Sequence, residues 1–150
     1  MWWNPRGSNN RYEAKEEIAR TGMSVVYKAY DTQLRCEVAI KTILDLTDKK
    51  AIKLFQRECE DLASLIHPNI VEILDVGQVK DRDGTRPYLV MRWLPGVTLG
   101  QLIRSSSSRL TVENCIDIFC QTCRGLQAAH ERGIIHRDLK PSNIFVMEDT

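Results

Sequence analysis

The sequence lacks an excess of charge of either sign. It has 21 Lys and Arg residues against 20 Asp and Glu residues, which gives a formal net charge of +1 over 150 residues. Proteins that bind nucleic acid through its phosphates usually carry a clear basic excess. The charge balance therefore gives no indication of a nucleic-acid partner, and we predict none.

Long apolar runs are also missing. No stretch approaches the roughly 18 to 20 consecutive apolar residues that a membrane-spanning helix needs. Residues 1–11 contain no apolar core of the kind found in a secretory signal peptide. We therefore expect a cytoplasmic protein, or the cytoplasmic part of a membrane-anchored parent, with no membrane segment within these residues. Asn, Pro, Gly and Ser dominate residues 1–10, which predicts a flexible leader.

The cysteines do not form an even, paired set. The chain has 5 of them, Cys36, Cys59, Cys115, Cys120 and Cys123, and an odd number without a signal peptide argues against a disulfide framework. Cys120 and Cys123 form a C-x-x-C pair, which can indicate a metal or redox site. No second C-x-x-C or histidine pair accompanies it, and the spacing places both on one face of a helix. We therefore expect all five to be small core residues in a reducing compartment.

Strand signals occupy much of the chain from Tyr12 to about Val90. Runs rich in β-branched and aromatic residues predict strands at 25–30, 36–43, 70–79 and 87–94. Asp31 and Thr32 favour a hairpin turn after the first of these, and the polar stretch 80–86 contains an Asp-Gly pair that is typical of a turn. Together with the strand signals that begin at Tyr12, these four runs predict a small five-stranded sheet with one helix inserted in it.

The inserted helix is predicted from apolar residues that recur at helical spacing. They are Ile52, Phe55, Cys59, Leu62 and Ile66. Thr47 is the expected N-cap, and the segment His67-Pro68-Asn69 should end the helix.

After residues 95–96, a Pro-Gly pair, the pattern becomes helical. Residues 97–104 predict a short helix that ends at a serine run, and Thr111 is the expected cap of a longer helix that runs to about Glu131. We find no internal repeat. The chain is therefore predicted to have an α+β fold, with a sheet-rich half, a helical half and a joint near residues 92–95.

The most specific stretch is HRDLKPSN, residues 136–143, which lies between a predicted helix and the apolar segment IFV. A loop held by a rigid scaffold is a common place for functional side chains. The alternative interpretation is an exposed polar turn formed by Pro141 and Ser142. However, the whole string resembles the catalytic loop of the eukaryotic-type (Hanks-type) serine/threonine protein kinases, and VAIK at residues 38–41 resembles the family's lysine-bearing strand.

Further segments extend this resemblance over residues 12–150. HPNIV at 67–71 is similar to the family's pattern, and GMSVVYKAYD at 22–31 is similar to that of bacterial members. The lysine at position 140 resembles the Ser/Thr branch. The resemblance implies a kinase-like α+β fold, with a partial kinase domain at residues 11–150. Its small lobe should span about residues 11–91, its hinge about 92–95 and the start of its large lobe 96–150.

The resemblance also implies the catalytic residues, namely Asp138, Lys140, Lys41 and Glu58, with Asn143 as a Mg²⁺ ligand. Lys41 should meet the phosphates of ATP. Because an apolar strand buries the base of its side chain, this cation needs an anionic partner, and Glu58 lies at the border of the apolar helical stripe. Taken alone, Lys41 and Glu58 are typical of solvated surface residues. Asp138 should orient or accept the proton of a serine or threonine hydroxyl in a protein substrate.

The expected ATP-binding residues are Ile18, Ala19, Thr21, Gly22, Ser24, Val26, Ala39, Lys41, Met91, Arg92, Trp93, Leu94 and Phe145. By resemblance, Ile18, Val26 and Ala39 cover one face of the adenine and Phe145 the other. The backbone of 92–94 forms the hinge, and Met91 is its gatekeeping residue. Arg137 should hold a phosphorylated activation segment.

The sequence departs from the family in its phosphate loop. Ala19, Thr21 and Ser24 stand where the family pattern has glycine. Because Thr21 is β-branched, we expect weaker gripping of the phosphates, with adenine binding kept.

The second departure is the absence of a D-F-G motif from the 150 residues. The aspartate of that motif is a principal Mg²⁺ ligand. We therefore expect the amino-terminal part of a Ser/Thr kinase that is inactive by itself, with an exposed apolar face on the 111–131 helix. The alternative is a truncated pseudokinase that binds a nucleotide or a partner without catalysis.

Overall fold

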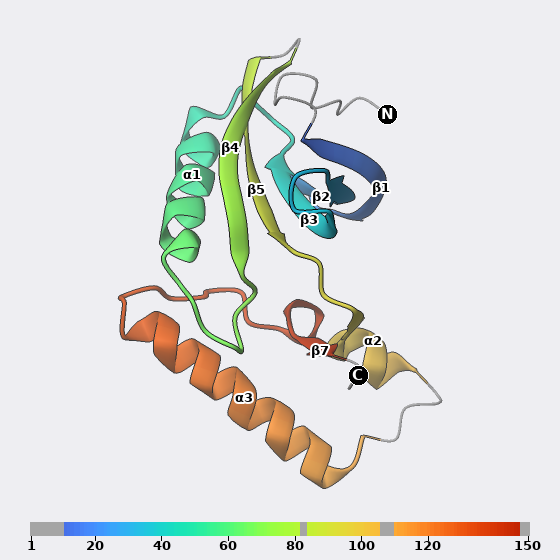
Figure 1. Cartoon of the computed structure of the whole chain (residues 1–150). Coiled ribbons are helices and arrows are strands. Elements are labelled where there is room, and N and C mark those ends of the chain that lie inside the picture. The colour runs from blue at the N-terminus through green and yellow to red at the C-terminus, as the bar shows by residue number, and fades with distance from the viewer. Residues whose placement is uncertain (1–10, 82–83, 106–109, 148–150) are drawn as a thin grey trace. The chain divides into compact units, whose positions relative to one another are not determined.

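The computed structural model describes residues 11–81, 84–105 and 110–147 (Figure 1). The predicted leader and most of the serine run lie outside the described residues. The chain divides into two compact units. We call them the sheet unit, Met1–Ile66 with Val71–Trp93, and the helical unit, His67–Ile70 with Leu94–Thr150. None of the described helices is long and apolar enough to cross a membrane.

A five-stranded antiparallel sheet, in the order β1-β2-β3-β5-β4, forms the sheet unit. Its strands are β1 (Tyr12–Arg20), β2 (Ser24–Asp31), β3 (Cys36–Ile43), β4 (Ile73–Asp81) and β5 (Gly84–Arg92). The prediction for β3 is confirmed. The strands predicted at 70–79 and 87–94 are each shifted by a few residues toward their connecting turn, because the β4–β5 ladder continues as far as the pair Asp81 and Gly84.

The two faces of this sheet bury different clusters. On β2, alternate residues Val25, Tyr27 and Ala29 enter a core shared with all the other strands of the sheet. Strand β3 is buried on both faces over residues 38–40, and its Ile43 packs with residues of a helix on the second face. That second face holds a smaller cluster of Ile43, Phe55, Cys59 and Leu89. These contacts fix the distance between β3 and the helix.

The covering helix is α1 (Lys49–Ala63), which lies along β4 and β5 in Figure 1. The predicted N-cap Thr47 is wrong: the carboxylate of Asp48 accepts from the N–H of Lys50 at 2.9 Å, and Thr47 instead donates its hydroxyl to Asp45. The helix also ends before Ile66, which is 85% exposed. The backbone N–H of Leu65 donates to the carbonyl of Leu62, and the side chain of Leu65 is buried. The chain therefore turns at Leu65, before it reaches Pro68.

The helical unit contains β6 (Gly96–Thr98), α2 (Leu99–Arg104), α3 (Val112–His130), the 3₁₀ turn η1 (Pro141–Asn143) and β7 (Phe145–Met147). The helix predicted at 97–104 begins two residues late, because Thr98 caps it and β6 pairs with β7. The predicted cap Thr111 is confirmed: its hydroxyl accepts from the N–H of Asn114 at 3.2 Å. Helix α3 exposes its predicted apolar face, with Val112, Ile116 and Phe119 at least 58% exposed.

The prediction that all five cysteines belong to the core is wrong. All are free thiols and only Cys59 is buried. Within the described residues, α3 buries only Gly125 and Ala129, so its three cysteines stay exposed. Helical spacing placed Cys120 and Cys123 correctly on a helix, but it does not determine whether another element covers that face. No group of three or more His, Cys, Asp or Glu residues suited to a metal occurs in the described part of the chain.

Cys59 should therefore resist alkylation in the folded chain. Burial raises the pKa of its thiol to about 11, so little reactive thiolate exists at about pH 8. Treatment with iodoacetamide should add four groups to the folded protein, one for each exposed cysteine, and a fifth only after unfolding. Intact-mass spectrometry with peptide mapping measures both. Modification of Cys59 as fast as Cys36 would contradict the packing of α1.

Candidate functional site

The expected nucleotide-contacting residues of the sheet unit occupy neighbouring positions in the sheet. Ala19 on β1 pairs with Val26 on β2, which in turn pairs with Lys41 on β3. In the adjacent row, Ala39 pairs with Met91 on β5. Val26 and Ala39 each lie between two residues of the larger core, and Lys41 follows Ile40 of that core. Because successive side chains of a strand point to opposite faces, these three lie on the other face, which α1 partly covers. Ile18, nearby on β1, is 42% exposed.

An ion pair joins the sheet to α1 on this face. The Nζ of Lys41 lies 2.9 Å from Oε1 of Glu58, as the requirement for an anionic partner predicted. The exposed fractions of the two side chains are 27% and 49%, so the pair remains open to solvent. Lys41 also lies 5.7 Å from the centre of the Phe55 ring, which is a cation–π distance. The buried neighbours of Glu58 on α1, Phe55 and Cys59, hold that helix in position.

The turn between β1 and β2 is closed by one hydroxyl group. The Oγ1 of Thr21 accepts from the N–H of Ser24 at 3.0 Å and from the N–H of Met23 at 3.3 Å. Gly22 has no atom within 4 Å of the position that a Cβ would take, so nothing around it requires a glycine for space. The sequence predicted an effect of Thr21 through β-branching, but it did not predict these hydrogen bonds.

The expected hinge begins at the end of β5. Arg92 forms an ion pair with Glu72, in which the Nε of Arg92 lies 2.8 Å from Oε2 of Glu72. The backbone N–H of Arg92 also donates to the backbone carbonyl of Glu72. The Nζ of Lys28 lies 4.5 Å from the ring centre of Trp93. These partners hold two of the three expected hinge residues. Sequence reasoning missed both partners, because neither lies near the hinge in the chain.

In the helical unit, the loop before η1 gathers the polar groups of HRDLKPSN. The Nζ of Lys140 lies 2.7 Å from a carboxylate oxygen of Asp138. The side-chain amide of Asn143 donates to the backbone carbonyl of Asp138 at 2.8 Å and to its carboxylate at 3.2 Å. The hydrogen bond from Lys140 is the largest cause that lowers the pKa of Asp138, so its carboxylate is ionised at neutral pH.

The backbone of this loop is bent sharply at its second residue. Arg137 has a φ of 61°, in the left-handed region that non-glycine residues seldom adopt and that is often found at functional sites. The N–H of Asp138 donates to the carbonyl of His136 and to its ring Nδ1. The bend therefore presents the Asp138 carboxylate to solvent next to Lys140.

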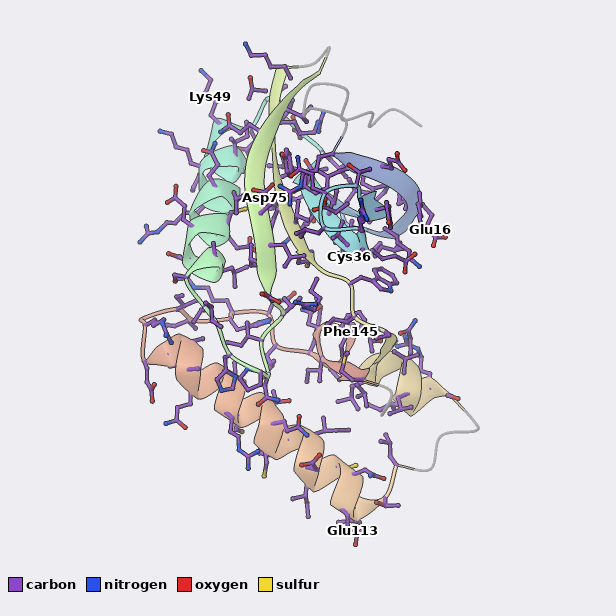
Figure 2. All side chains as sticks on the ribbon, in the orientation of Figure 1. Glu16, Cys36, Lys49, Asp75, Glu113 and Phe145 are labelled. Atoms are coloured by element: carbon purple, nitrogen blue, oxygen red, sulfur yellow. The ribbon has the colours of Figure 1, made fainter. Side chains whose placement is uncertain are left out.

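The site offers oxygen donors that suit Mg²⁺. The amide nitrogen of Asn143 is engaged with Asp138, so its oxygen is the atom that can meet a cation. Phe145, labelled in Figure 2, follows on β7. Its exposed fraction is 47%. The donor set of this loop thus fits a hard cation that takes its remaining ligands from other groups.

Comparison with known proteins relates the chain to a family. Residues 12–150 match the family model of the protein kinase domain. Serine/threonine-protein kinase PknB of Mycolicibacterium smegmatis is 36% identical over 147 residues, which are 97% of this chain and 23% of that protein. A probable serine/threonine-protein kinase of Clostridium acetobutylicum is 40% identical over 143 residues, 94% of this chain and 21% of the relative. The chain thus spans less than a quarter of the length of these relatives.

Solved structures show the same α+β fold. A crystal structure of the PknI kinase domain of Mycobacterium tuberculosis aligns with a TM-score of 0.75 and 26% identity, over 92% of this chain and 55% of that one. A double mutant of the same domain aligns with a TM-score of 0.76 and 25% identity, over 93% of this chain and 56% of that one.

Proposed function

The chain belongs to the protein kinase domain family, as the string HRDLKPSN predicted, and from this premise we propose that it is part of a kinase that transfers the γ-phosphate of ATP to serine or threonine in proteins. The observation that carries the proposal is the ion pair between Lys41 and Glu58, 2.9 Å apart. A strand lysine held by a helix carboxylate is the arrangement that positions ATP phosphates in this family.

In this proposal the sheet unit binds the nucleotide. Lys41 neutralises charge on the α- and β-phosphates, and Glu58 sets its position. The apolar side chains of Ile18, Val26 and Ala39 contact one face of the adenine. The β1–β2 turn, from Ala19 through Gly22 to Ser24, lies over the phosphates.

The remaining expected contacts come from the hinge and from β7. Met91 limits the depth of the adenine pocket, and the backbone groups of residues 92–94 bond the edge of the base. Phe145 contacts the other face of the adenine.

The helical unit supplies the groups that act on the substrate hydroxyl. Ionised Asp138 orients the hydroxyl and accepts its proton, while Lys140 offsets charge on the transferring phosphate. Asn143 would help to hold a Mg²⁺ ion, which would supply positive charge next to the phosphates when bound. Arg137 meets a phosphorylated segment through paired hydrogen bonds.

We also propose that the domain works in the cytoplasm on protein substrates, and that residues 1–150 by themselves bind ATP without transferring its phosphate.

A second candidate function is a binding module without catalysis. The hydroxyl of Thr21 already occupies two backbone N–H groups of the turn, which favours weak contact with phosphates. Such a module binds a nucleotide or a partner through the same surfaces. Phosphoryl transfer by the product of the whole reading frame would exclude it.

Replacing Lys41 tests the nucleotide site. Lys41→Met should weaken ATP binding to residues 1–150 by about tenfold to a hundredfold, because a hydrogen bond to a charged group contributes about 1.5–3 kcal/mol. The affinity for adenosine, which has no phosphates, should fall much less. Isothermal titration calorimetry with both ligands measures the difference.

The matched control is Lys15→Met, because Lys15 also forms an exposed ion pair, 3.1 Å from Glu37 on β3. It should leave ATP binding unchanged. Equal losses of ATP affinity in the two variants would contradict the role of Lys41.

A further inference from the structure

We propose that the hydroxyl of Thr21 competes with the ATP phosphates for the backbone N–H groups of the β1–β2 turn, and so sets how strongly this site distinguishes ATP from adenosine. The inference rests on the proposed nucleotide-binding function. It replaces the β-branching of Thr21, which the sequence suggested as the cause of weak phosphate gripping, with a hydrogen-bond competition.

The geometry of the turn makes the hydroxyl a cap. Arg20 pairs with Val25 at the end of the β1–β2 ladder, and the N–H of Thr21 donates to the carbonyl of Ser24 at 2.8 Å. This closure brings the Thr21 side chain over the turn. Its Oγ1 accepts from the N–H groups of Ser24 and Met23, at 3.0 and 3.3 Å, and lies 3.1 Å from the Ser24 hydroxyl.

These N–H groups are the ones that a phosphate needs. Successive N–H groups at the tip of a turn form a small concave site for an anion, and phosphate-binding loops use them in this way. The tip is exposed at Thr21, Gly22 and Met23, so a ligand can reach it. The carbonyl of Met23 accepts from Leu44, beyond the end of β3, which fixes the turn against the sheet. The site is therefore formed and accessible, but an internal oxygen occupies its donors.

The nearby positive charge is also engaged. The guanidinium of Arg20 bonds the carboxylate of Glu17 at 2.7 and 2.5 Å. A phosphate that approaches the turn therefore meets N–H donors that are already hydrogen-bonded and an arginine that is already paired with a carboxylate. Since an intramolecular hydrogen bond contributes about 0.5–1.5 kcal/mol net, displacing the cap should reduce the phosphate-dependent part of ATP affinity by about threefold to tenfold.

Two substitutions separate the hydroxyl from the branch. Thr21→Val keeps the β-branched shape and removes the hydroxyl, whereas Thr21→Ser keeps the hydroxyl and removes the branch. If the hydroxyl competes with phosphate, the valine variant should bind ATP about threefold to tenfold more tightly relative to adenosine. The serine variant should show a smaller increase in ATP affinity relative to adenosine. If β-branching is the cause, only the serine variant should bind ATP more tightly relative to adenosine.

The experiment is calorimetric titration of residues 1–150 with MgATP and with adenosine, and the measured quantity is the dissociation constant of adenosine divided by that of MgATP. Thr47→Val is the matched control, because it removes another exposed hydroxyl, bonded to Asp45 at 2.6 Å, from a loop of the same unit. It should leave the ratio unchanged. Amide hydrogen exchange of Met23 and Ser24, measured by NMR without nucleotide, should accelerate in Thr21→Val and not in Thr47→Val.

The outcomes are distinguishable. A ratio that rises in Thr21→Val, together with faster amide exchange, supports the competition. A native chain that binds adenosine and ATP, with no change of ratio in Thr21→Val, overturns the competition and leaves the proposed function standing. A native chain that binds neither ligand overturns both.

Discussion

Replacing Asp138 by asparagine is expected to lower phosphoryl transfer by the product of the whole reading frame by about a hundredfold to ten-thousandfold, the usual contribution of a positioned general base. Asparagine has the same shape but cannot accept a proton. The carboxylate lies 2.7 Å from the Nζ of Lys140, and this hydrogen bond lowers the pKa of Asp138, which favours the ionised form. The loss should appear in kcat rather than in KM for ATP, because Asp138 is placed to act on the substrate hydroxyl.

A steady-state kinase assay with varied ATP measures both constants. The control is Asp117→Asn, since Asp117 is an exposed carboxylate on α3 that accepts a hydrogen bond from Gln121. Its activity should equal that of the native enzyme. An Asp138→Asn enzyme with native kcat would show that Asp138 has no part in the chemistry.

Replacing Phe55 by alanine should cost about 3–5 kcal/mol of the unfolding free energy of the sheet unit, the range for truncating a buried phenylalanine. The side chain is 6% exposed and packs with Ile43, Cys59 and Leu89 between α1 and the sheet. Small domains are stable by only about 5–15 kcal/mol, so the loss is a large part of the total. Because the same ring lies 5.7 Å from Lys41, the ion pair with Glu58 should also loosen.

Urea unfolding followed by circular dichroism measures this cost. Leu54→Ala is the matched control, because Leu54 is the adjacent residue on α1 and is 57% exposed. It should change stability by less than about 0.5 kcal/mol. Similar losses for the two variants would mean that α1 does not pack as described.

Local patterns in the sequence were enough to predict several elements. Strand β3 and helix α3, with its cap at Thr111, follow from β-branched runs, helical spacing and a capping residue. The start of α1 was missed because Thr47 and Asp48 are both good capping types, and the hydroxyl of Thr47 is bonded to Asp45, which leaves Asp48 as the cap. The exposure of Cys120 and Cys123 was missed for a different reason. A helical pattern shows that residues share a face, but it does not show what covers that face.

The contacts of the candidate site could likewise be predicted only in part from the sequence. The pairing of Lys41 with Glu58 could be predicted from the family resemblance, which singled out this glutamate, whereas the two residues taken alone are typical of solvated surface positions. Glu72, which pairs with Arg92, could not be predicted, because the two are 20 residues apart and the register of β4 and β5 brings them together. The role of the Thr21 hydroxyl likewise depends on closure of the β1–β2 turn. That closure could not be predicted from the pattern of residues.

The most direct test is to identify the residues labelled when the product of the whole reading frame is incubated with γ-labelled ATP, Mg²⁺ and a protein substrate. Phosphoamino-acid analysis should find the label on serine and threonine, and Lys41→Met and Asp138→Asn should each remove it, while Lys15→Met and Asp117→Asn keep it. No transfer by the native protein, label only on tyrosine, or transfer that survives Asp138→Asn would contradict the proposed kinase function.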